Sequence, residues 1–251
     1  MVGEEVRYMG TAFAVAAGVI LVANMAVRAR GASWLAVGLK TLCGVCFCVL
    51  GIAGVVHIWS GEARVRQLGI LILAGLVLGL LGDVALAVKD LVNDRYELWF
   101  LAGFGFFALG HLAYITAMVR GWMTPFPWVP ILVCAVLAAS YVGFSKTLKL
   151  DFGRMAGVVG VYSFLVLMLP AMGFFAMATG IGPSQAILQA GGTISQPAVV
   201  AAAGLAFLVS DLILAWTYFG PGKDKGWENV VCYVFYYAAQ FGIAASLFKV
   251  L

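Results

Sequence analysis

Apolar residues fill eight long stretches of this chain, and polar residues gather in the segments between them. The stretches are 9–27, 33–58, 68–88, 98–119, 126–144, 154–178, 197–219 and 230–249. A helix needs about 20 apolar residues to cross a bilayer. Spanning segments must also satisfy their own backbone hydrogen bonds, which favours helices for stretches this long and uninterrupted. The pattern predicts an all-α membrane protein with eight transmembrane helices, folded as a single polytopic domain over residues 1–251.

The composition agrees with this class. Hydrophobic residues make up 64% of the chain and charged residues 10%, whereas about a quarter of the residues in a soluble domain are charged. The formal net charge of +4 then reflects membrane orientation and attraction to anionic headgroups, so nucleic acid is not an expected partner. Glu4 and Glu5 stand where a cleavable signal would have basic residues, so we expect the first helix to be retained.

The cysteines offer no metal site by their spacing. All five lie inside predicted helices, where cysteine packs as a small hydrophobic side chain: Cys43, Cys46, Cys48, Cys134 and Cys232. No pair of cysteines or histidines has zinc-binding spacing, and no other metal motif is present. We therefore predict no metal and no cofactor.

Basic residues divide unequally between the two ends of the predicted helices. The end that holds the N-terminus has five: Arg7, Arg64, Arg66, Arg120 and Lys249. The opposite end has nine: Arg28, Arg30, Lys89, Arg95, Lys146, Lys149, Arg154, Lys223 and Lys225. Because cytoplasmic loops are richer in Lys and Arg, the second end is predicted to be cytoplasmic. The membrane would be that of the endoplasmic reticulum in a eukaryote or the inner membrane in a bacterium.

Two aspartates lie inside predicted helices in closely similar hexapeptides. Asp83 belongs to Gly-Asp-Val-Ala-Leu-Ala (82–87), and Asp211 to Ser-Asp-Leu-Ile-Leu-Ala (210–215). A carboxylate within a bilayer costs from about 3 to more than 10 kcal/mol, so such residues usually face a protein interior and have a function. The two hexapeptides are four helices apart and run in the same direction. They predict two parallel four-helix halves that build one polar site.

Counting along the helices brings other polar side chains to the depth of the aspartates. Both aspartates lie about 8–12 Å below the cytoplasmic end, at 1.5 Å per residue. The side chains predicted in the same layer are those of Lys40, Tyr162, Tyr237 and Gln240. His111 lies deeper and shares a helical face with Tyr114. The sequence thus predicts a cavity that opens toward the cytoplasmic leaflet.

Helical spacing also indicates which faces turn inward. Gly75, Gly79 and Asp83 recur every fourth residue, and stripes of small residues are where membrane helices pack closely. Tyr237 and Gln240 share a face with the preceding tyrosines by the same rule. For the tyrosines, and for His111, packing alone is an alternative to a role in chemistry.

Four strings along the chain resemble the lysoplasmalogenase family, the YhhN-like membrane proteins. They are Leu-Gly-Asp-Val-Ala-Leu (81–86), Phe-Phe-Ala-Leu-Gly-His-Leu-Ala-Tyr (106–114), Phe-Leu-Val-Ser-Asp-Leu-Ile-Leu-Ala-Trp (207–216) and Tyr-Tyr-Ala-Ala-Gln (236–240). Their order and spacing match over nearly the whole chain from the second helix onward. Lys40 also matches a lysine of this family, although here no proline follows it closely.

The resemblance implies hydrolysis of the vinyl ether bond of lysoplasmalogens, which gives a fatty aldehyde and a glycerophospho-ethanolamine or -choline. Its expected partners are a lysophospholipid substrate and the bilayer. Cleavage of a vinyl ether needs an acid that protonates the alkene, a carboxylate that stabilises the cation, and a base for water. Asp83 and Asp211 would be this pair, with their assignment open. His111 would position water or move a proton, and Lys40 would hold one aspartate ionised or contact phosphate. The groups expected to orient them are Tyr162, Tyr237 and Gln240.

A proton-coupled carrier or channel is the main alternative, because paired intramembrane acids and a histidine also build proton relays. Against it, both acids lie toward one side of the membrane, and Pro170 is the only proline in the middle of a predicted helix. A scaffold without chemistry is a third class, which the cost of two buried carboxylates disfavours.

Overall fold

In the computed structural model the chain is a bundle of α-helices. The structure describes residues 2–122, 126–180, 195–221 and 226–249, and these form eight α-helices. The helices are α1 Val2–Arg28, α2 Trp34–His57, α3 Ala63–Val88, α4 Tyr96–Gly121, α5 Trp128–Gly143, α6 Ala156–Thr179, α8 Gln196–Phe219 and α9 Trp227–Ser246. Three short 3-10 turns are Asn93–Arg95, Gly153–Met155 and Leu247–Lys249. The prediction of an all-helical protein is confirmed.

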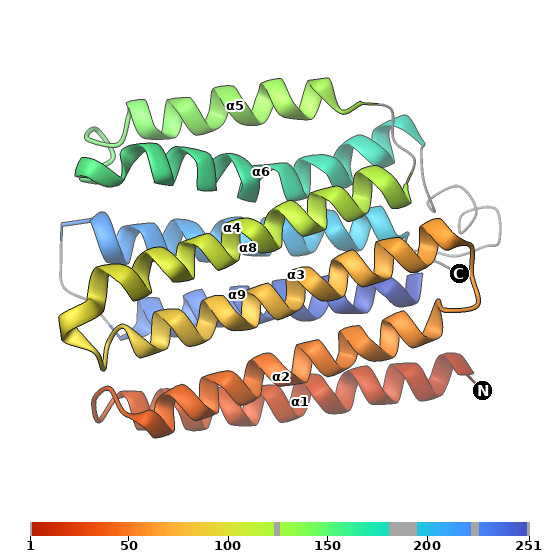
Figure 1. Cartoon of the computed structure of the whole chain (residues 1–251), viewed down its shortest axis with the longest axis horizontal. Coiled ribbons are helices and arrows are strands. Elements are labelled where there is room, and N and C mark those ends of the chain that lie inside the picture. The colour runs from red at the N-terminus through yellow and green to blue at the C-terminus, as the bar shows by residue number, and fades with distance from the viewer. Residues whose placement is uncertain (1, 123–125, 181–194, 222–225, 250–251) are drawn as a thin grey trace.

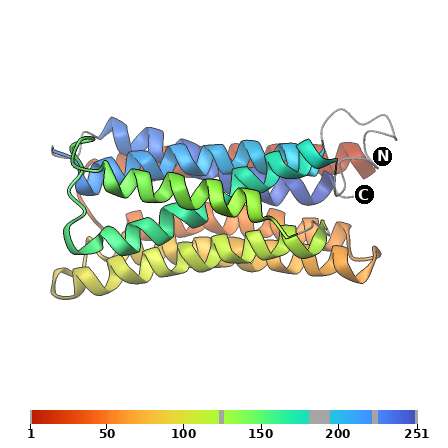
Figure 2. The same cartoon turned by 90° about the horizontal axis from the view of Figure 1, so that it is seen from above.

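The helices lie side by side along one axis (Figure 1). α1 begins and α9 ends at the same end of the bundle (Figure 1). The view from above shows the same alignment throughout (Figure 2). The end opposite the termini holds the connections α1–α2, α3–α4, α5–α6 and α8–α9.

Each half of the chain packs its helices in the same order. Contacts run α1–α2–α3–α4 in the first half and α5–α6–α8–α9 in the second. The halves meet mainly through α4 on α6 and α2 on α9, and α3 and α1 also contact α9. The first two contacts are equivalent if α4 corresponds to α9 and α2 to α6. Two parallel four-helix halves would have this arrangement, and the internal repeat remains a prediction.

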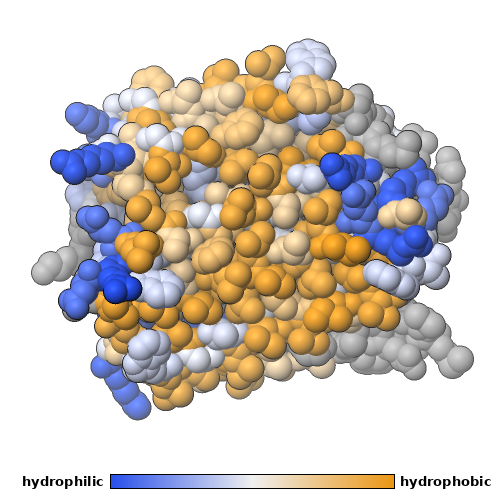
Figure 3. Space-filling model, in the orientation of Figure 1, coloured by the Kyte–Doolittle hydropathy of each residue, from blue (hydrophilic) through white to orange (hydrophobic). Residues whose placement is uncertain are grey.

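On the face shown in Figure 3, an apolar belt covers the middle of the bundle, and hydrophilic residues lie at its two ends. Large apolar side chains that are exposed on the helices include Val56, Leu109 and Val161. In the described residues, five helices are long and apolar enough to cross a membrane: α2, α3, α4, α6 with its preceding turn, and α8. These features indicate a multi-pass membrane protein. The count of eight spans stays a prediction, because Val15–Arg28 and α5 are shorter apolar helices and α9 is not among the five.

Helix bounds differ from the predicted stretches where polar or proline residues intervene. α3 begins at Ala63 rather than 68, because Arg64 and Arg66 extend the helix beyond its apolar part. α5 begins only at Trp128, with Pro127 at its N-cap. α6 continues through Pro170, which packs directly against Gly204 of α8.

Glycines let α3 approach its neighbours closely around the two aspartates' layer. A side chain at Gly75 would overlap the ring of Tyr114, and one at Gly79 would overlap the amide of Gln240. The backbone of Gly110 in α4 lies against that of Gly75. The stripe of small residues therefore faces other helices, as its spacing predicted.

Candidate functional site

An ion pair joins α2 to α3 inside the bundle. Lys40 Nζ lies 2.9 Å from Asp83 Oδ1, and the two side chains are 7% and 2% exposed. The Lys40 ammonium also lies over the ring of Tyr233, 5.1 Å from its centroid. Asp83 therefore has a cationic partner on a neighbouring helix.

The second aspartate has a neutral partner. The Tyr162 hydroxyl of α6 donates a hydrogen bond to Asp211 Oδ2 of α8 at 3.1 Å. Ser210 and Cys232 contact each other beside it, with Oγ and Sγ 3.4 Å apart. The two aspartates thus lie in different electrostatic surroundings, one beside an ammonium and one beside a phenol.

Both aspartates line one small cavity of about 30 Å³. This is enough space for a water molecule. Its lining residues come from α2, α3, α4, α6, α8 and α9: Lys40, Asp83, Leu86, Phe107, Tyr162, Phe207, Ser210, Asp211, Leu214, Cys232, Tyr233 and Tyr236. Asp83 Oδ2 is buried and has no hydrogen-bond partner among the described residues. A carboxylate oxygen is therefore left to act on whatever occupies this cavity.

A chain of hydrogen bonds supports the wall formed by α9. Tyr114 donates to Gln240 Oε1 at 2.8 Å, and Gln240 Nε2 donates to the Tyr236 hydroxyl at 2.9 Å. Tyr236 in turn donates to the Gly79 carbonyl at 3.3 Å. Tyr114 and Gln240 thus fix Tyr236, which lines the cavity, and do not line it themselves.

Tyr237 also lies outside the lining of this cavity. Its hydroxyl donates to the backbone carbonyl of Lys40 at 3.4 Å, and its ring lies beside Phe47. This contact ties α9 to α2 at the residue that holds Asp83.

His111 lies among aromatic rings rather than against either aspartate. Its ring centroid is 5.0 Å from that of Phe207 and 5.9 Å from that of Tyr162. Nδ1 is 2.9 Å from the Phe107 carbonyl, which fits a protonated Nδ1 that donates. Nε2 is buried without a hydrogen-bond partner in the described part of the chain. The arrangement gives His111 no direct contact through which to move a proton to Asp83 or Asp211.

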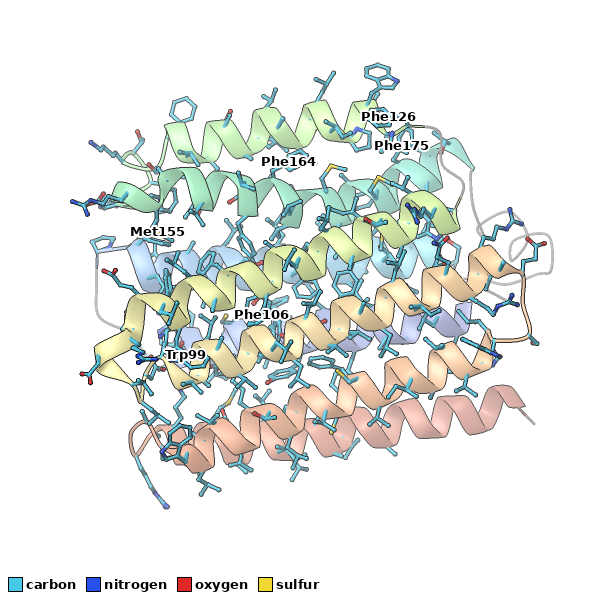
Figure 4. The ribbon with its side chains drawn as sticks, in the orientation of Figure 1. Trp99, Phe106, Phe126, Met155, Phe164 and Phe175 are labelled. Atoms are coloured by element: carbon cyan, nitrogen blue, oxygen red, sulfur yellow. The ribbon has the colours of Figure 1, made fainter. Side chains whose placement is uncertain are left out.

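A larger, mainly apolar cavity of about 210 Å³ adjoins the small one. Its walls come from α4, α5, α6 and α8, and it shares Tyr162, Asp211 and Leu214 with the small cavity. Phe106 of α4 and Phe164 of α6, both labelled in Figure 4, are not among its lining residues. Asp211 thus lines both the apolar cavity and the small cavity that Lys40 and Asp83 also line.

Some lining residues were not predicted as site residues. Tyr233 and Tyr236 of α9 are examples, although their spacing from Gln240 already placed them on its face. Ser210 and Cys232 gave no such signal, because each reads as an ordinary small residue in an apolar helix. In the described residues, no group of three or more His, Cys, Asp or Glu side chains could hold a metal ion.

Comparison with known proteins gives one match. The sequence model of the YhhN family matches residues 35–247. No curated protein and no solved structure is a significant match to the chain. The matched range begins in α2 and includes both aspartates and every residue that lines the small cavity.

Proposed function

Because the chain belongs to the YhhN family, which contains lysoplasmalogenases, we propose that it hydrolyses the vinyl ether bond of a lysoplasmalogen. The products are a fatty aldehyde and a glycerophospho-ethanolamine or -choline. One observation supports this most: two aspartates from different helices line one cavity, and one of them also lines an adjoining apolar cavity.

The two cavities suit the two parts of this substrate. The alkenyl chain is apolar and fits between α5, α6 and α8, where most lining side chains are hydrophobic. The vinyl ether bond then lies near Asp211 and Tyr162, which both cavities share. This position excludes bulk water from the reacting carbon, which strengthens each electrostatic contact there.

Asp211 is the proposed general acid. Its hydrogen-bond partner is the neutral Tyr162 hydroxyl, whereas the Lys40 ammonium pairs with Asp83. Asp211 gives its proton to the alkene carbon that does not bear the ether oxygen, and the carbon bonded to that oxygen becomes an oxocarbenium ion next to the new carboxylate. An acid with this role contributes about 10²- to 10⁴-fold to a rate.

Asp83 is the proposed carboxylate and base. The Lys40 ammonium is its counter-charge, with Nζ 2.9 Å from Asp83 Oδ1. Water adds to the oxocarbenium carbon and gives up a proton to the aspartate pair, which restores the acid. The hemiacetal then collapses: its hydroxyl proton moves to the glycerol oxygen, the carbon–oxygen bond breaks, and aldehyde and alcohol separate. Two carboxyl groups divide the roles in glycoside hydrolysis by the same logic.

The proposed site lies toward the cytoplasmic leaflet. Asp83 and Asp211 lie near the ends of α3 and α8 that lead into the loops opposite the chain termini. These loops hold nine of the basic residues against five at the other end, which favours the cytoplasmic side.

The test is aldehyde release from lysoplasmenyl-ethanolamine by the purified protein in detergent. The variants are Asp83→Asn and Asp211→Asn, and the matched control is Asp151→Asn in the exposed α5–α6 loop. We expect release by the parent and the control, and a loss of about a hundredfold or more in each site variant that stays folded. No release by folded parent, together with proton flux in liposomes that depends on both aspartates, would replace the hydrolase with a carrier.

A further inference from the structure

A polar pocket lies at the same end of the bundle as the two aspartates. Its volume is about 300 Å³, and its lining residues are Arg28, Ala32, Ser33, Ala36, Val37, Ala87 and Asp90. We call it the headgroup pocket. It contains a positively and a negatively charged side chain, whereas the lining of the apolar cavity between α5, α6 and α8 is mainly hydrophobic.

The headgroup pocket lies one helical turn beyond the Lys40–Asp83 ion pair. Ala36 precedes Lys40 by four residues in α2, and Ala87 follows Asp83 by four residues in α3. Residues four apart lie on one face, about 6 Å apart along the axis. The headgroup pocket therefore lies between the ion pair and the end of the bundle, while the small cavity shares Tyr162, Asp211 and Leu214 with the apolar cavity.

The two charged side chains of the headgroup pocket pair with each other, and Lys89, outside the lining, also binds Asp90. Arg28 Nη2 donates to Asp90 Oδ2 at 2.8 Å, and these side chains are 32% and 24% exposed. Lys89 binds the other oxygen of Asp90 and lies over the rings of Tyr96 and Tyr218. Burial lowers the pKa of Lys89 from its ordinary value, and the contact with Asp90 opposes that shift. Asp90 thus keeps its contact with Lys89 even if Arg28 binds a ligand instead.

We propose that the headgroup pocket binds a phosphoethanolamine headgroup, with Arg28 on the phosphate and Asp90 on the primary ammonium. An arginine fork suits phosphate oxygens, and only one of its donors is used by Asp90. A primary ammonium donates hydrogen bonds to a carboxylate, whereas choline is recognised by aromatic faces. None of the described lining residues is aromatic. This inference rests on the proposed function and adds to it a preference for ethanolamine over choline.

The kinetic test compares three substrates with one alkenyl chain: the ethanolamine lipid, the choline lipid and alkenylglycerol without phosphate. We expect kcat/KM for ethanolamine to exceed that for choline by about tenfold, since one charged hydrogen bond is at stake. Asp90→Asn removes this preference through KM, and Asp90→Glu restores part of it. Arg28→Gln raises KM for both phospholipids and leaves alkenylglycerol unchanged. The control Arg30→Gln, at an exposed neighbouring position, changes none of these values.

A binding measurement separates this inference from the proposed reaction. The probe is glycerophosphoethanolamine with a saturated 1-alkyl ether, which has no vinyl bond to cleave, titrated against the full-length protein. Binding that weakens about tenfold in Asp90→Asn and Arg28→Gln supports the pocket even if no aldehyde is ever released. Equal affinity for ethanolamine and choline ethers in the parent, or unchanged affinity in both folded variants, overturns it.

Discussion

Lys40 and Asp83 form an ion pair almost fully removed from water, with Nζ and Oδ1 2.9 Å apart. Tyr162 occupies the same position in α6 that Lys40 occupies in α2, the seventh residue, and it holds the other aspartate. Each acid is therefore held by a side chain of another helix, Asp83 by a charge from α2 and Asp211 by a hydroxyl from α6. This difference underlies the roles proposed for the two acids.

Lys40→Met is expected to destabilise the protein, because it leaves the Asp83 carboxylate buried without its counter-charge. Breaking a buried pair by removing one member costs about 3–5 kcal/mol. The double variant Lys40→Met/Asp83→Leu should recover most of this loss, since no charge then remains. Thermal unfolding in detergent measures both. A single variant as stable as the parent would contradict the ion pair.

Tyr162→Phe is expected to lower kcat by about 10- to 100-fold, because a hydrogen bond to a charged group contributes about 1.5–3 kcal/mol. The ring contacts with Phe104 and His111 remain. Tyr141→Phe is the matched control: Tyr141 lines the same apolar cavity, and its buried hydroxyl has no partner among the described residues. Equal effects of the two substitutions would remove Tyr162 from the mechanism.

Val166→Trp is expected to shorten the chain that the protein accepts. Val166 is buried and lines the apolar cavity from α6, so a larger side chain takes the space of chain carbons. KM for long-chain substrates should rise while short-chain substrates are cleaved as before. Val161→Trp, on the exposed face of the same helix, serves as the control. The two variants are compared by aldehyde release from substrates over a series of chain lengths.

His111→Phe is expected to keep near-parental turnover. The imidazole lies among rings and lines neither cavity, and phenylalanine loses only the Nδ1 contact with the Phe107 carbonyl, which costs about 0.5–1.5 kcal/mol. Steady-state kinetics and thermal unfolding test both parts. A loss of a hundredfold in a stable variant would instead assign His111 a direct part in proton transfer.

Gly75→Ala is expected to destabilise the bundle by about 1–3 kcal/mol, as overpacking usually does. The new methyl group would overlap the Tyr114 ring where α3 and α4 meet. Gly105→Ala in α4 meets no atom within 4 Å and should be neutral or stabilising, because alanine favours helix. Unfolding of the two variants in the same detergent compares them.

The helices themselves could be predicted because each apolar stretch must form one in a bilayer. The helix ends could not be predicted from the apolar stretches alone. α3 includes the polar residues Arg64 and Arg66, and α5 begins only after Pro127. Counting residues also gave the depth of Lys40 and Tyr162 near the aspartates. Depth alone could not tell which acid each would bind, because that depends on which helices are neighbours.

Other features needed the three-dimensional packing. Tyr237 was predicted at the right depth, yet its hydroxyl turns to the Lys40 backbone rather than to an aspartate. From the sequence, Arg28 served only to predict the membrane orientation, although its side chain binds Asp90, which is 62 positions further along the chain. Contacts of this kind join residues that are far apart in the sequence, and helical periodicity does not predict them.

Two of the residues that line the apolar cavity, Leu137 of α5 and Leu212 of α8, are about half exposed on the belt that would face lipid. The cavity is thus open sideways, while the headgroup pocket is open at the end of the bundle. For the proposed reaction, the two products would leave by different routes. The aldehyde would pass between α5 and α8 into the membrane, and the glycerophospho-alcohol would diffuse into the aqueous phase.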